Sequence, residues 1–113
     1  MNTAMGRCNK NFTILLNIIE DNKSYDFSLQ TKEEILMEKR SISNKLKLIK
    51  NYSKKFSIQK EVDFLDKEFN EYTELLGNHI DDIETLKLLK KDLYRPLSLM
   101  AQKLYEIMIK LYD

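Results

Sequence analysis

The fold is decided by residues 62–111, which read VDFLDKEFNEYTELLGNHIDDIETLKLLKKDLYRPLSLMAQKLYEIMIKL. Steps of three and four residues connect one series through this segment without a slip. Its members are Val62, Leu65, Phe69, Tyr72, Leu76, His79, Ile83, Leu86, Lys90, Leu93, Leu97, Met100, Leu104, Ile107 and Leu111. Only His79 and Lys90 are plainly polar. Such a series is the seam of a coiled coil or a close-packed helical bundle.

A second, shorter series precedes this seam and predicts another long helix. Its apolar members are Ile35, Ile42, Leu46, Ile49 and Phe56. The sequence Thr31-Lys32-Glu33-Glu34 is a capping box, which marks the start of the helix. The two series are out of phase, so we predict a break near residues 57–59. A connection this short favours an antiparallel neighbour.

Opposite charges mark the two sides of this predicted break. Residues 39–60 carry eight positive charges and no negative one, whereas residues 61–84 carry nine negative charges and one positive. The formal net charge of the whole chain is only +1. The two segments attract each other if the chain folds back on itself, or if copies pair head to tail.

The remaining elements are shorter. Residues 1–9 are expected to form a loose tail, and residues 10–20 a short helix, although their apolar spacing also fits a strand. Gly77 and Asn78 either end one helix and cap the next, or lie within a continuous or bent rod, which the unbroken seam favours. Pro96 predicts a kink or short break near residues 94–95.

These boundaries define an all-α fold in one domain. We predict an antiparallel helical hairpin or coiled coil, or an elongated bundle of three to four helices: a basic helix at 31–56, an acidic helix at 59–94 and a hydrophobic helix at 96–112. The chain has 113 residues with only two glycines and one proline, which argues against a sheet protein and its many tight turns.

Composition also bounds the cellular setting. A single cysteine, Cys8, cannot form an internal disulfide, so a reducing compartment is the simplest interpretation. We find neither a convincing secretion signal nor an apolar run long enough to span a bilayer. An intracellular, cytoplasmic protein is expected, with the nucleus as the alternative.

Sequence motifs for catalysis are missing. The only histidine, His79, has Asp82 three residues later, and this pair on one helix face could contribute to a metal site. A di-iron bundle needs a second histidine, which the chain lacks. A polar seam residue more often fixes register or oligomeric state, and we assign that role to His79 and Lys90. We therefore expect no enzyme activity, metal or cofactor.

Binding to another protein is the function that the sequence favours. The C-terminal segment is apolar on more than one face, so it is expected either to contact a partner or a second copy, or to form the centre of a monomeric bundle. The predicted interface consists of Phe69, Tyr72, Leu76, Leu97, Met100, Leu104, Ile107 and Leu111.

The alternative is binding to nucleic acid through segment 39–60, because lysines neutralise phosphates. The candidate anion-binding residues are Lys45, Lys47, Lys50, Lys54 and Lys55. The acidic segment 61–84 that follows competes with nucleic acid for these lysines. Solvated lysines paired with that neighbouring segment are the simpler interpretation.

Overall fold

The computed structural model describes the backbone of residues 3–24, 26–27 and 29–112, and the side chains of residues 10–24, 26–27 and 29–111. Within these ranges the elements are α1 (Thr3–Lys23), α2 (Lys32–Ser53), α3 (Gln59–Asn78), α4 (Ile83–Leu88) and α5 (Lys90–Tyr112), and there is no strand. The predicted all-α fold is confirmed.

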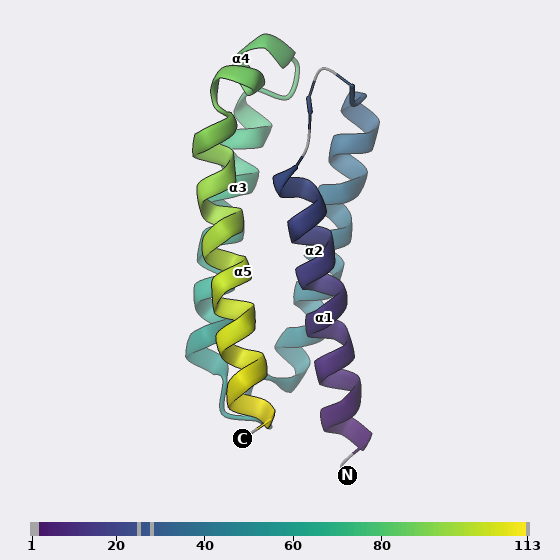
Figure 1. Ribbon diagram of the computed structural model, residues 1–113, viewed down its shortest axis with the longest axis vertical. Helices are drawn as coiled ribbons and strands as arrows, with labels where there is room; N and C mark the ends of the chain where they lie inside the picture. The colour runs from purple at the N-terminus through teal and green to yellow at the C-terminus, as the bar shows by residue number, and fades with distance from the viewer. Residues whose placement is uncertain (1–2, 25, 28, 113) are drawn as a thin grey trace.

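The four long helices form an elongated bundle that runs up, down, up and down, with α4 across one end (Figure 1). Helix α1 packs against α2 and α5, and α3 packs against the same two helices, so the four close a ring around one core. The molecule measures 48 × 20 × 19 Å. Short connections between antiparallel neighbours are typical of this topology.

The start of α2 lies where the sequence predicts it, whereas the break after it covers residues 54–58 and only overlaps the predicted break at 57–59, because α2 ends at Ser53 and not at residue 56. The Glu34 amide donates to Thr31 Oγ1 at 3.1 Å, and the Thr31 amide donates to Glu34 Oε2 at 3.4 Å. At the other end, the Ile58 and Ser57 amides donate to the carbonyls of Ser53 and Lys54. Ser57 has a φ of 57°, which completes a Schellman motif and turns the chain into α3.

The first helix is longer than predicted. Helix α1 includes residues 3–9, which we expected to form a tail, and it continues through Lys23. Its last turn is favoured by the side-chain amide of Asn22, whose Nδ2 atom donates to the Ile18 carbonyl at 2.7 Å, and by the Lys23–Glu20 ion pair at 3.4 Å. The predicted tail also includes residues 1–2, which lie outside the described residues.

The predicted acidic helix at 59–94 is wrong, because this segment contains α3, α4 and the first turn of α5. Helix α3 ends at Asn78, and α4 begins after Asp82, whose carboxylate accepts hydrogen bonds from the amide and hydroxyl of Thr85. These bonds also hold the pKa of Asp82 below its usual range. The local cap at Asp82 stabilises a new helix start, which ends the rod that the seam favoured.

Of the two alternatives predicted near residues 94–95, the short break is wrong, because α5 is continuous there, and the kink stays a prediction. The interruption lies at Leu89, and α5 begins at Lys90 rather than at residue 96 and continues through Pro96. Proline cannot donate to the residue four positions earlier, which here is Asp92. Because Asp92 is exposed in the first turn of α5, water can satisfy its carbonyl.

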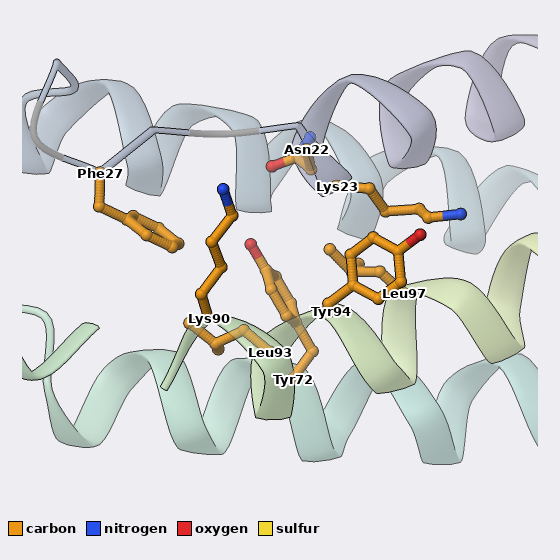
Figure 2. A pocket seen from close by; sticks show the side chains of 8 residues that line it. All are labelled: Asn22, Lys23, Phe27, Tyr72, Lys90, Leu93, Tyr94 and Leu97. Atoms are coloured by element: carbon orange, nitrogen blue, oxygen red, sulfur yellow. The ribbon is translucent and has the colours of Figure 1, made fainter. Parts of the chain in front are cut away.

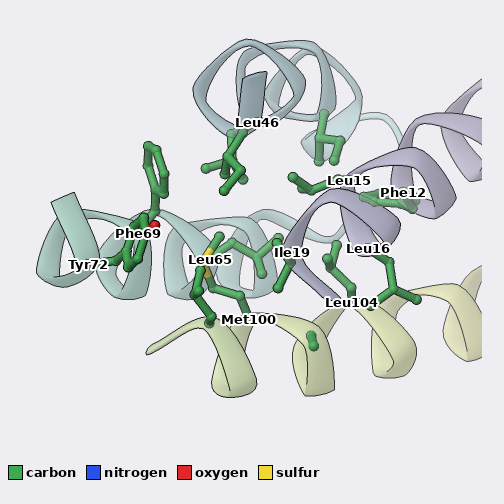
Figure 3. Packing of buried hydrophobic residues seen from close by; sticks show 14 of the residues in the cluster. Phe12, Leu15, Leu16, Ile19, Leu46, Leu65, Phe69, Tyr72, Met100 and Leu104 are labelled. Carbon is green, nitrogen blue, oxygen red and sulfur yellow. The ribbon is translucent and has the colours of Figure 1, made fainter. Parts of the chain in front are cut away.

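The core contains the predicted seam together with apolar residues of α1 and α2 (Figure 3). Twelve of the fifteen seam residues are buried; the exceptions, His79, Ile83 and Lys90, lie where the chain passes from α3 to α5. The seam stays regular across this junction although the helix does not, because the buried rows of α3 and α5 happen to share one phase.

Candidate functional site

The eight residues predicted to contact a partner lie inside this chain's own bundle. Each is at most 8% exposed, and together they pack against α1 and α2. Figure 3 shows Met100 and Leu104 of α5 pointing toward Leu65 of α3 and Ile19 of α1. A partner could contact these side chains only if the bundle opened, so a binding surface must be sought on the outside.

The outer side of α5 carries large apolar side chains. Tyr94, Tyr105 and Ile109 are all exposed, Ile109 to 63%. They are 11 and 15 residues apart along α5, which is three and four helical turns, so they share one side. Leu88 of α4 is 85% exposed near the start of this row. Sequence reasoning missed Leu88 and Tyr94 because it followed the seam, and both lie off it.

The predicted anion-binding lysines do not gather at one place. Lys45 is partly buried, and Lys50 is bound to Asp66 of α3 at 2.6 Å. Lys47 and Lys54 are exposed and, being seven residues apart, lie on one side of α2. Lys55 lies in the turn that follows α2. The five lysines therefore do not form one cluster.

Two rows of charged and polar side chains do lie together, on the side where α2 meets α3. The basic row is Arg40 and Lys47 of α2 and Lys54, which directly follows α2 with a helical backbone; the three repeat every seven residues. The acidic row is Asp63, Asp66, Asn70 and Glu74, which repeat every three or four residues of α3. The Lys50–Asp66 ion pair marks the sides of α2 and α3 that face each other, and both rows flank it. Among the described side chains, no member of the basic row has an ion-pair partner within 4.0 Å.

The residues assigned to seam register lie at the junction of α3, α4 and α5. His79 is partly buried, and its carbonyl accepts from the Asp82 amide at 2.9 Å. Lys90 is exposed. In the part of the chain whose side chains are described, no three His, Cys, Asp or Glu residues form a group that could hold a metal ion. His79 thus contributes to the turn that ends α3.

A small cavity of about 10 Å³ lies at this end of the bundle. It is lined by Asn22, Lys23, Phe27, Tyr72, Lys90, Leu93, Tyr94 and Leu97. Figure 2 shows Asn22 and Tyr72 pointing toward each other across it. The Lys23 ammonium lies 4.9 Å from the centre of the Tyr94 ring, a cation–π contact. This volume is close to that of one water molecule, so the cavity is too small for a substrate.

One buried carboxyl group stands out on α3. Glu68 is only 6% exposed, and its Oε2 atom has no hydrogen-bond partner. Burial, together with the negative charge of Glu71, raises the pKa of Glu68, although Lys67 and Arg95 act in the opposite direction. Glu68 therefore lowers the stability of the fold when it is ionised.

Comparison of the chain with family models, curated proteins and solved structures finds no match. Among the described residues, no helix combines the length and apolar character that crossing a bilayer requires.

Proposed function

We propose that this chain is a non-enzymatic helical protein–protein interaction module that self-associates through its outer surface. The observation that carries the proposal is the opposite charge on α2 and α3, most of which the chain does not neutralise internally. Lys50–Asp66 is the one ion pair that joins these helices in the described part of the chain. Glu68 is buried, but Arg40 and Lys47 of α2 and Asp63 and Glu74 of α3 are exposed, so a second molecule can contact them.

The burial of the seam supports association through the outer surface. Each long helix already covers its apolar row with two neighbours, so the bundle presents a folded body with fixed side-chain rows. Complementary charged rows steer encounters and fix orientation, but exposed ion pairs are individually weak, with about 0.2–1 kcal/mol each. The association is therefore expected to be reversible and sensitive to salt.

Light scattering combined with size-exclusion chromatography tests this function directly. The chain should form a defined oligomer at about 20 mM salt and dissociate as the salt concentration rises beyond physiological values, because counterions screen exposed charges. A monomer over the whole range of protein and salt concentrations would contradict self-association.

The apolar row of α5 provides a second arm of the test. If the oligomer resists high salt but is lost in the Tyr105→Ser/Ile109→Ser variant, the contact between molecules lies on the apolar row of α5. Met37→Ser/Leu48→Ser is the matched control, because these are also exposed apolar residues but lie on α2. Retention on duplex DNA would instead favour nucleic-acid binding, which the adjacent acidic row opposes.

A further inference from the structure

From the two charged rows we infer that α2 and α3 of one molecule pack against α3 and α2 of a second copy around a twofold axis parallel to the bundle. This inference rests on the proposed self-association and adds the surface, the symmetry and the register. Helices α2 and α3 form one layer, behind α1 and α5 in Figure 1. The basic row and the acidic row run side by side along the outside of this layer.

The geometry of two antiparallel helices makes this layer complementary to itself. A half-turn about an axis along the bundle exchanges left and right but does not change height. It therefore places the basic row of each molecule opposite the acidic row of the other, and both contacts are identical. A patch that binds a copy of itself in this way closes a dimer and cannot continue into a filament.

The register within one chain gives the register between two. Lys50 of α2 is level with Asp66 of α3, as their ion pair shows. Because the helices are antiparallel, Lys54 is then level with residue 62, Lys47 with residue 69 and Arg40 with residue 76. Acidic-row residues of the copy lie within three residues of each level, which is about 5 Å at a rise of 1.5 Å per residue. Long basic side chains reach across such an offset.

A second copy fits this layer better than a polyanion does. A phosphate backbone would contact the basic row but would also meet the acidic row beside it on α3. A partner that carries both rows, at the spacing found here, satisfies both. The copy is a partner whose surface is known to have this pattern.

The test uses two charge-reversed variants of the full chain. The basic-row variant is Arg40→Glu/Lys47→Glu/Lys54→Glu. The acidic-row variant is Asp63→Lys/Asn70→Lys/Glu74→Lys, which leaves the Lys50–Asp66 pair intact. We expect each variant alone to have half the scattering mass of the wild-type dimer at low salt. An equimolar mixture should regain the full mass, because each variant then meets its complement.

The control is Lys10→Glu/Lys87→Glu/Lys91→Glu, which reverses three exposed charges on α1, α4 and α5, outside the layer, and should remain dimeric. Circular dichroism checks that every variant is folded. If the basic-row variant dimerises as the wild type does, or if the equimolar mixture stays monomeric, this interface is wrong. Self-association of the wild type would then still stand. Equal losses in the basic-row variant and the control would also overturn this interface. A monomeric wild type would remove the proposed function itself.

Discussion

Replacing the buried carboxyl of Glu68 should make the protein more stable. Glu68 is 6% exposed and its Oε2 atom lacks a hydrogen-bond partner. A buried polar group without a partner costs about 1–3 kcal/mol. In Glu68→Leu this cost disappears and apolar atoms occupy the site, while the attraction of Lys67 and Arg95 is lost. We expect the free energy of unfolding in urea to rise by about 1–2 kcal/mol at pH 7.

The pH dependence identifies the cause. Because the pKa of Glu68 is raised in the folded state, the protonated folded form is favoured, and wild-type stability is lost as pH rises through that pKa. The advantage of Glu68→Leu should therefore be larger at pH 7 than at pH 4, where the wild-type carboxyl becomes neutral. Urea titrations at the two pH values measure this difference.

Glu71→Leu, at an exposed position one turn away, is the matched control. It removes a nearby negative charge but no buried one, so its effect at pH 7 should be smaller. The reasoning fails if Glu68→Leu destabilises the protein at pH 7, or if its gain is unchanged at pH 4.

Four further substitutions test the core, the turns and the helix cap by urea unfolding. Leu104→Ala should lower the free energy of unfolding by about 2–5 kcal/mol, whereas Gln102→Ala on the exposed side should change it little. Ser57→Gly should raise the free energy of unfolding, because Ser57 has a positive φ, which glycine adopts more easily. Gly77→Ala should raise it by about 0.5–1 kcal/mol, because Gly77 lies in a helix with open space at Cβ. Thr31→Ala should lower it by about 0.5–2 kcal/mol through loss of the cap. The opposite sign in any variant would contradict its assigned conformation.

The helices and most of the core could be predicted because apolar spacing reports directly which residues must be covered. The break at residues 57–59 was visible as a change of phase between two buried rows. The break between α3 and α5 was hidden, because the eleven residues of α4 and its connections, 79–89, restore the same phase. A series of apolar residues therefore indicates burial, but it does not show that one helix carries it.

The surface was harder to predict, for a different physical reason. The seam requires that Leu97, Met100 and Leu104 be covered, and helices of the same chain can cover them as well as those of another. The seven-residue repeat of the basic row is visible in the sequence. Its position beside the acidic row depends on the antiparallel register of α2 and α3, which the Lys50–Asp66 contact establishes in three dimensions.

The up-and-down path of an even number of long helices brings the start of α1 and the end of α5 to the same pole of the molecule (Figure 1). The bundle could thus be spliced into an exposed loop of an unrelated host protein, with both junctions leaving side by side. Such a graft would keep α4 and the opposite pole clear of the host, and would give a compact handle for displaying the helices of this protein.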